Sequence, residues 1–307
     1  MKPVVAPVAY LLISHGSRDP RPKEAMNRLA DLVRQRLEDS LQSAKTKGHR
    51  RPSSVETSVE GDSRSFAEDY SLGDSTKGQG ASRTLLLTRP QFKSSAEAPP
   101  AHCDVIVGTA CLELSPIELS EQIVKFAQRL MAAGVRELKL LPVFLMAGVH
   151  VMEDLPAEIA KAKQQLGDAI ELTLCPHLGG HAQMLDVLNQ RIEAVPAEAA
   201  LLVAHGSRRS KGNRKIKMLG QQLNTEVAYW AIAPDIEEKI IELMQQGAQR
   251  IAIFPYFLFA GGITDAITLR TEELAERFPK VKFRLLPTLG ATNEMADLAV
   301  YILLGSR

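Results

Sequence analysis

The apolar positions of the chain fall into short runs separated by stretches with helical spacing. Four runs rich in Val, Ile and Leu come first: LLIS, VIVGTA, LKLLPVFL and IELTLC. Short continuous runs of this kind are typical of parallel strands buried on both faces, and the periodic stretches between them are typical of crossover helices. The pattern predicts helices at 22–39, 116–133, 153–166 and 181–193.

The same pattern then occurs a second time. AYLLISHGSR recurs as ALLVAHGSRR, AGVRELKLLPVFLMAGVH as GAQRIAIFPYFLFAGGIT, and PHLGGH as PTLGAT; ACLELSPIELSEQIVKF matches YWAIAPDIEEKIIELM more loosely. Matches in the same order indicate a duplicated unit. A chain of 307 residues is also longer than most single domains. We therefore predict two tandem α/β domains, 1–195 and 196–307, with second-copy helices at 211–224, 234–247, 265–277 and 292–303.

One segment of the first copy has no counterpart in the second. From about 40 to 100 the chain is rich in Ser, Thr, Gly, Lys and Glu and has few large apolar residues. Such a composition cannot bury enough apolar surface to offset the entropy lost on ordering. It predicts a mobile insertion, favoured as a passive surface loop over a lid or a partner-binding segment. Within it, LLLT at 85–88 is a candidate edge strand.

Composition excludes several classes of protein. The net charge of +1 offers no general attraction to nucleic acid or to a membrane, and no apolar run approaches the length of about 18 residues that spans one. Cys103, Cys111 and Cys175 show no C-x-x-C spacing, which disfavours a disulfide framework, a zinc knuckle or an iron–sulfur cluster. The start of the chain is unlike a signal peptide, and no nucleotide-binding motif is present. We expect a cytoplasmic protein.

Three polar residues follow predicted strands of the first copy. His15 ends the first strand in SHGSR, Glu113 follows the next in ACLELSP, and His150 follows PVFLMAGV. Open parallel sheets bind ligands at the carboxyl ends of their strands, so we expect these side chains in one crevice. Imidazole and carboxylate suit Fe(II), Co(II), Ni(II) and Zn(II) and leave coordination positions open. Glu113 is alternatively a general base.

The second copy serves as an internal control. His15 recurs as His205, whereas Glu113 aligns with Ala231 and His150 with Ile263. A set needed only for folding would be needed in both copies. Because two members are replaced together, we predict that the three residues act jointly, as a metal-handling set in the first copy.

The other polar candidates are less specific. His177 and His181 are separated by a Gly-Gly turn, so they do not form a helical metal pair, and we expect a structural or crevice-lining role. Arg18 and Arg208 lie in basic clusters after the two HGS turns and could bind carboxylates of a ligand. A solvated helix face is an equally good interpretation of these clusters.

The ordered set of motifs resembles the sirohydrochlorin chelatases, the class II tetrapyrrole chelatases of siroheme and cobalamin synthesis. The shared phrases are LLISHGSR, LELSP, PVFLMAGVH followed by EDLP, and PHLGGH, and they cover nearly the whole chain outside the insertion. The resemblance implies two chelatase-like (flavodoxin-like) parallel-sheet domains that face a common cleft for the macrocycle. It implies that His15 and His150 handle the metal, with Glu113 as their acidic companion. Some members are half-length and dimerise, so the fused chain implies a monomer.

The reaction implied by the resemblance is the insertion of Fe(II) or Co(II) into sirohydrochlorin without ATP, a lyase activity. The metal is a substrate, and no further cofactor is expected. Ser14, Ser17, Arg18 and Arg208 are candidates for binding the carboxylates of the tetrapyrrole. The ligand types do not decide between iron, cobalt and nickel. The alternatives are a carrier that binds metal or tetrapyrrole without turnover and, disfavoured by the start of the chain, a periplasmic-type two-lobe binding protein.

Overall fold

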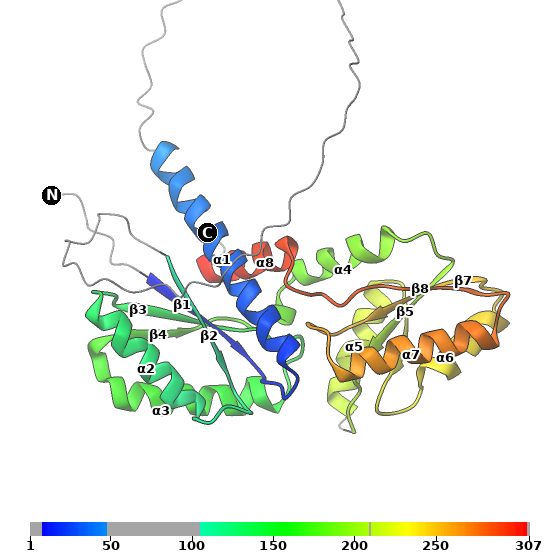
Figure 1. The fold of residues 1–307 in the computed structure, drawn as a ribbon, viewed down its shortest axis with the longest axis horizontal. Helices are drawn as coiled ribbons and strands as arrows, with labels where there is room; N and C mark the ends of the chain where they lie inside the picture. Colours follow the sequence, from blue (N-terminus) through cyan, green and yellow to red (C-terminus); the bar gives the residue numbers. More distant parts are fainter. Residues whose placement is uncertain (1–7, 48–104, 209, 306–307) are drawn as a thin grey trace, which may run out of the picture. The chain divides into compact units, whose positions relative to one another are not determined.

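The computed structural model describes residues 8–47, 105–208 and 210–305. In the first repeat, strands alternate with helices in chain order (Figure 1): β1 (Val8–Ser14), α1 (Pro20–Lys47), β2 (Ile106–Cys111), α2 (Leu119–Ala132), β3 (Glu137–Pro142), α3 (Leu155–Leu166), β4 (Glu171–Leu174) and α4 (Gln183–Glu193). Three short turns of helix accompany them: η1 (His150–Asp154), η2 (Gly167–Ala169) and η3 (Leu178–Gly180).

The second repeat has the same alternation. It comprises β5 (Ala199–Ala204), α5 (Ser210–Gln222), β6 (Glu226–Tyr229), α6 (Ile236–Gln245), β7 (Arg250–Pro255), α7 (Gly262–Arg277), β8 (Lys282–Leu285) and α8 (Asn293–Leu304). Each repeat builds a four-stranded parallel sheet, in the order β2-β1-β3-β4 and β6-β5-β7-β8. The predicted fold class, two tandem parallel-sheet α/β units, is therefore confirmed.

Two element boundaries differ from the predicted ones. Helix α1 continues to Lys47 rather than ending near 39, because the sequence after that point, SLQSAKTK, contains several good helix formers and no Gly or Pro. Strand β3 ends at Pro142, short of the apolar run that predicted it. The division predicted at 195 lies between α4 and β5. The rest of the predicted insertion, 48–104, lies outside the described residues together with its candidate strand at 85–88.

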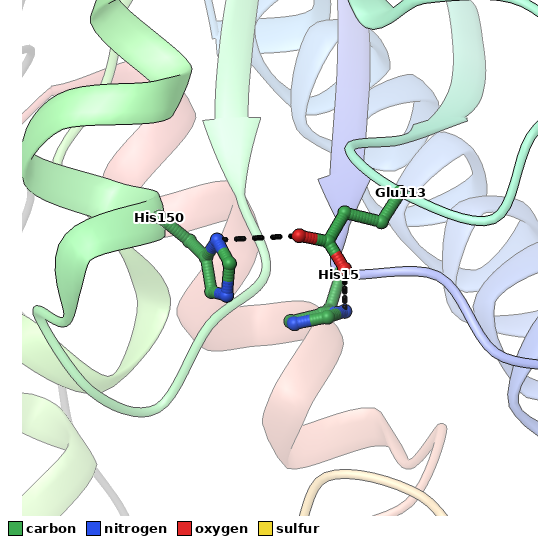
Figure 2. Close-up of side chains that lie close together, drawn as sticks. All are labelled: His15, Glu113 and His150. Carbon is green, nitrogen blue, oxygen red and sulfur yellow. Dashed lines mark ion pairs between the residues drawn. The ribbon is translucent and has the colours of Figure 1, made fainter.

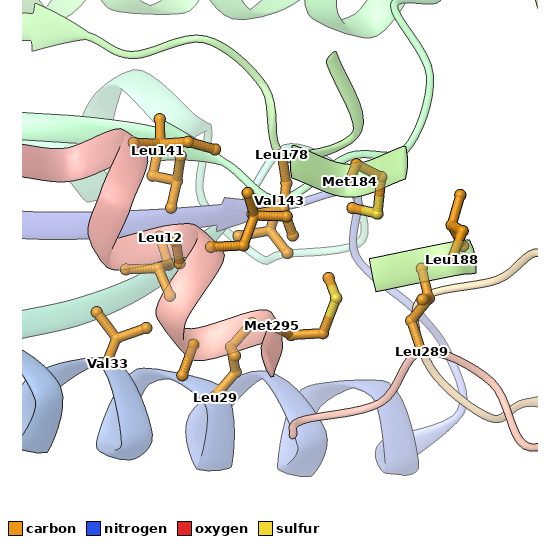
Figure 3. Packing of buried hydrophobic residues seen from close by; sticks show 14 of the residues in the cluster. Leu12, Leu29, Val33, Leu141, Val143, Leu178, Met184, Leu188, Leu289 and Met295 are labelled. Carbon is orange, nitrogen blue, oxygen red and sulfur yellow. The ribbon is translucent and has the colours of Figure 1, made fainter. Parts of the chain in front are cut away.

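One apolar core includes residues from both repeats. Figure 3 shows Met295 of α8 beside Leu29 of α1, with Leu12 of β1 in the same cluster, and all three are almost completely buried. Two polar contacts accompany this packing: Lys139 of β3 donates to the Leu303 carbonyl at 2.9 Å, and Arg36 lies 2.7 Å from the Asp297 carboxylate. The last helix of the second repeat thus packs on the sheet of the first.

Helix α4 makes the reciprocal connection. The guanidinium of Arg191 donates to the carbonyls of Thr288 and Leu289 and to the Thr292 hydroxyl, all in the loop before α8. Two further clusters each belong to one repeat, on the opposite face of its sheet. None of the described helices has the length and apolarity needed to cross a membrane.

The shared core predicts that the two repeats unfold together. Leu29→Ala should lower the free energy of unfolding by about 2–5 kcal/mol, because it opens a cavity at a fully buried position. Trp230, the chain's one tryptophan, lies in the second repeat, so its fluorescence reports on that repeat during urea denaturation. We expect the fluorescence and far-ultraviolet circular dichroism transitions to shift together.

The matched control is Leu41→Ala on the same helix. The Leu41 side chain is 45% exposed, so its removal should change stability by no more than about 0.5 kcal/mol. A Trp230 transition that stays in place while the dichroism transition of Leu29→Ala moves would contradict a shared core.

Candidate functional site

The topology brings three strand ends of the first repeat to one edge of the sheet. Strand β1 pairs with β2 on one side and with β3 on the other, and Ser14 is opposite Cys111 while Ile13 is opposite Pro142. The chain therefore leaves β1 at a switch point, where crossover connections diverge to the two sides and ligand sites of open α/β sheets form. His15, Glu113 and His150 all lie on the connections that follow these three strands.

A glycine allows two of these connections to touch. Gly16 has a φ of 105°, and a Cβ atom at this position would lie 2.1 Å from the carbonyl oxygen of Glu113. The backbone N–H of Glu113 donates to the His15 carbonyl at 2.8 Å. Leu114 has a φ of 58°, in the left-handed region that costs a residue with a Cβ about 1–3 kcal/mol. The HGS turn thus fixes His15 beside Glu113, and backbone strain is concentrated there.

The three side chains converge on one point (Figure 2). Glu113 lies between the imidazoles, with Oε2 at 3.9 Å from His15 Nδ1 and Oε1 at 3.7 Å from His150 Nδ1. Each residue offers one ligand atom, which is one of the two ring nitrogens of each histidine or a carboxylate oxygen of Glu113, and the three atoms lie within 4.8 Å of one another. Atoms bound to one ion at about 2.0–2.2 Å lie about 3–4 Å apart, so a modest contraction would complete a metal site.

The site is open on one side. The side chains of His15, Glu113 and His150 are 47%, 48% and 37% exposed, which leaves room for a further ligand to reach an ion between them. His15 also lies near the ring of Phe144, with 6.4 Å between ring centroids, and the two imidazoles meet edge to face at 4.5 Å. The predicted convergence of the three residues is therefore what the structure shows.

A fourth polar residue contacts this set. Asp154 Oδ2 lies 2.8 Å from His150 Nδ1, within hydrogen-bond distance. Both residues belong to η1, a π-helical turn closed by the Leu155 N–H, which donates to the His150 carbonyl five residues earlier. Sequence reasoning missed Asp154 because it placed the start of the helix at 153. The signal was the spacing of four residues between His150 and Asp154, which puts two side chains on one helical face.

A large cleft adjoins the site and is lined by both repeats. Its volume is about 2380 Å³, larger than the roughly 300–1,000 Å³ of most small-molecule pockets. His15 and His150 lie in its wall together with His205 of the second repeat. Apolar side chains form much of the rest: Met26, Val143, Phe144, Leu145, Ile216, Tyr256, Phe257, Leu258 and Phe259. The expected common cleft is confirmed.

The predicted carboxylate-binding residues also lie in the cleft wall. Ser14, Ser17, Arg18 and Arg208 all line it. The Ser14 hydroxyl donates to the Ala110 carbonyl at 3.4 Å, and the Ser17 hydroxyl accepts from the Asp19 N–H at 3.1 Å. Nearby, the Arg21 guanidinium lies between Asp19 and Asp265, and its hydrogen bonds lower the pKa of both carboxyl groups.

The second repeat has the same backbone arrangement as the site but lacks the carboxylate and the second imidazole. The N–H of Ala231 donates to the His205 carbonyl at 2.9 Å, as Glu113 does to His15, so Ala231 occupies the position of Glu113. His205 Nδ1 lies 2.8 Å from the Gly206 carbonyl. Among the described residues, His15, Glu113 and His150 are the one group of three that could hold a metal ion.

His177 and His181 lie away from the cleft wall. Burial, reinforced by the charge of Lys215, lowers the pKa of His177. The ring of His181 packs edge to face on Tyr301 at 5.1 Å, and its Nδ1 accepts from the Gln183 N–H. Of the two roles expected for this pair, the structural one fits these contacts.

Both repeats of the chain match one known protein family. The CbiX family model matches residues 100–195 and 199–303, one segment in each repeat. His15 precedes the first matched segment, whereas Glu113 and His150 lie within it.

Relatives of the chain carry chelatase names. The chain is 23% identical over 202 residues to the sirohydrochlorin cobaltochelatase of Priestia megaterium, covering 61% of this chain and 64% of the relative. It is 31% identical over 112 residues to the chloroplastic sirohydrochlorin ferrochelatase of Arabidopsis thaliana, covering 33% and 49%. The chain thus matches about half to two thirds of the length of these relatives.

Solved structures share the fold. SirB from Bacillus subtilis, solved with Fe3+, superimposes with a TM-score of 0.60 at 16% identity and covers 97% of this chain and 94% of its own. DR2241 from Deinococcus radiodurans, a multi-domain protein with structural similarity to chelatases, gives 0.56 at 16% identity, covering 97% and 54%. Since the two segments that match the family model together span more than half of the 307 residues, the chain belongs to the CbiX family, with two CbiX repeats in one polypeptide.

Proposed function

We propose that this chain inserts Fe(II) or Co(II) into sirohydrochlorin without nucleotide hydrolysis, in siroheme or cobalamin synthesis. One observation carries the proposal: His15, Glu113 and His150 present ligand atoms within 4.8 Å of one another beside a cleft of about 2380 Å³. The relatives named above include both a cobaltochelatase and a ferrochelatase of sirohydrochlorin. Imidazole and carboxylate accept either metal, so the ligand set favours neither.

The metal is a substrate that this site receives and gives up. Neutral imidazoles of His15 and His150, with Glu113 as a third ligand, would hold the ion and leave its remaining positions free for the nitrogens of the macrocycle. Insertion also removes two pyrrole N–H protons. Glu113 would accept one of them as a general base, and a histidine released from the ion would accept the other. Because these three side chains are about half exposed, the macrocycle could reach an ion bound between them, which suits transfer better than storage.

The macrocycle would lie against the apolar wall of the cleft. Its peripheral carboxylates would meet Arg18 from the first repeat and Arg208 from the second, with the Ser14 and Ser17 hydroxyls as additional donors. Because one polypeptide supplies both walls, we propose that the protein acts as a monomer. We further propose a cytoplasmic location, where a reducing environment keeps Fe(II) available.

His15→Ala and His150→Ala should each lower the insertion rate by at least about 100-fold, because each removes either a metal ligand or a proton acceptor. The measurement is an anaerobic assay with sirohydrochlorin and Fe(II), Co(II) or Ni(II) in parallel, following the loss of the free-base absorption band. His205→Ala is the matched control and should lose far less, because its repeat lacks the partner residues. Wild-type rates in either first-repeat variant would refute the assignment.

Arg18→Ala and Arg208→Ala should raise the KM for sirohydrochlorin several-fold and leave kcat nearly unchanged, because carboxylates on the rim are bound equally before and during insertion. Steady-state kinetics over a range of macrocycle concentrations measure both constants. Arg129→Ala, on the exposed surface of α2, is the control and should behave as wild type. A fall in kcat with an unchanged KM would place the arginines in the chemical step instead.

A carrier that binds metal and tetrapyrrole without releasing a product would use the same cleft. With sirohydrochlorin and Co(II) in excess over protein, a chelatase converts many equivalents per chain, whereas a carrier stops at one. We expect multiple turnovers in the anaerobic assay. A single stoichiometric conversion would favour the carrier.

A further inference from the structure

Asp154 is the side chain that fixes one of the two histidines. Its Oδ2 lies 2.8 Å from His150 Nδ1, whereas Glu113 Oε1 lies 3.7 Å from the same nitrogen, beyond hydrogen-bond distance. The strong partner of His150 is therefore Asp154 and not the carboxylate between the imidazoles.

This contact determines which ring nitrogen is free. A carboxylate can only accept hydrogen bonds, so the nitrogen that faces Asp154 at 2.8 Å must carry the proton. A neutral imidazole has one N–H and one bare nitrogen, which leaves Nε2 of His150 with its lone pair. Figure 2 shows this second nitrogen on the side of the ring that lies toward His15.

The two histidines are held unequally. His15 makes no side-chain hydrogen bond to any other residue in the described ranges, and its closest acidic atom is Glu113 Oε2 at 3.9 Å. His150 is tied to the turn η1 by Asp154 on the same turn. Within the described residues, one imidazole is thus held by a side-chain hydrogen bond and the other by ring contacts and the longer ion pair with Glu113.

We propose that Asp154 is a positioning residue, which holds His150 as the Nδ1–H tautomer so that Nε2 binds the incoming metal. The inference rests on the proposed metal-handling role of His150. Metal-binding histidines commonly donate their second ring N–H to a carboxylate, which fixes the tautomer and raises the basicity of the ligand.

The second repeat changes the same two positions together. The alignment that pairs His150 with Ile263 pairs Asp154 with Ile267, and both replacements are apolar. Ile267 is fully buried in the core of that repeat, and α7 is a regular α-helix from Gly262 onward, without a π-helical turn. A surface ion pair that only supported the helix would not have to disappear with its histidine. The joint replacement fits a carboxylate that serves the histidine.

The test compares Asp154→Asn with Asp168→Asn in the full chain. Asparagine keeps the shape of the side chain, but its amide can either donate or accept, so it no longer selects a tautomer. Asp168 is exposed on η2 and is not part of the cleft lining. Asp168→Asn therefore removes the same single charge away from the site and serves as the matched control. Circular dichroism melting checks that both variants are folded.

Two readouts do not depend on insertion activity. Titration with Co(II) alone, followed by its visible absorption, should show affinity weakened roughly 10- to 100-fold in Asp154→Asn and unchanged in Asp168→Asn. Nitrogen-15 NMR of the histidine rings should show His150 with a proton on Nδ1 in the wild type and a mixture of tautomers in Asp154→Asn. With Zn(II) as a diamagnetic probe, the wild-type His150 should bind through Nε2.

The inference is overturned if Asp154→Asn keeps both the wild-type Co(II) affinity and the single tautomer, or if Zn(II) binds His150 through Nδ1. These outcomes are separate from a failure of the proposed function. A wild-type chain that binds Co(II) with the expected dependence on Asp154 but never converts sirohydrochlorin would refute the chelatase assignment and leave the role of Asp154 intact.

Discussion

The parallel pairing of β1 with both β2 and β3 is the constraint on which the site depends. Because all three strands run the same way, their carboxyl ends meet at one edge, and the chain that leaves each strand must cross that edge before it enters a helix. His15, Glu113 and His150 lie in those crossings. The close approach of Gly16 to the Glu113 carbonyl then sets the spacing between the first two. Sheet topology brings the residues to one region, and this backbone contact holds His15 beside Glu113.

Much of this arrangement could be predicted from the sequence, because its causes are local or periodic. Buried parallel strands require continuous apolar runs, so the strands and helices were located within a few residues, except for the end of α1. Strand ends of a parallel sheet share an edge, so three polar residues after three such runs could be placed together without knowing any distance. The duplication added a comparison within the chain, in which Ala231 and Ile263 mark what the second repeat lacks.

Two features could not be predicted from the sequence: the packing between the repeats and the contact of Asp154. The first depends on contacts between distant segments, and the second on irregular backbone. Met295 in α8 packs against Leu29 in α1 and so joins the repeats. The sequence does not identify this pair of helices, because other helices of both repeats also have an apolar face. Asp154 was missed for a different reason. A regular helix was expected to begin after His150, whereas the chain forms a π-helical turn that includes His150 itself. Turns of this kind are stabilised by tertiary packing and are frequent at functional sites, so helical periodicity alone does not reveal them.

The shared core also gives the second repeat a role that its missing ligands do not explain. A cleft with a wall from each repeat keeps its width only if the repeats are held together, and α8 and α4 do this by packing across the division between them. The second repeat has its own sheet, terminal helix and cleft wall, with Ala231 and Ile263 where the first repeat has Glu113 and His150. His205 also lies in that wall, with its Nδ1 at 2.8 Å from the Gly206 carbonyl oxygen. Among the described residues, the one group that could hold a metal ion therefore lies at the wall from the first repeat, and the second repeat completes the cleft.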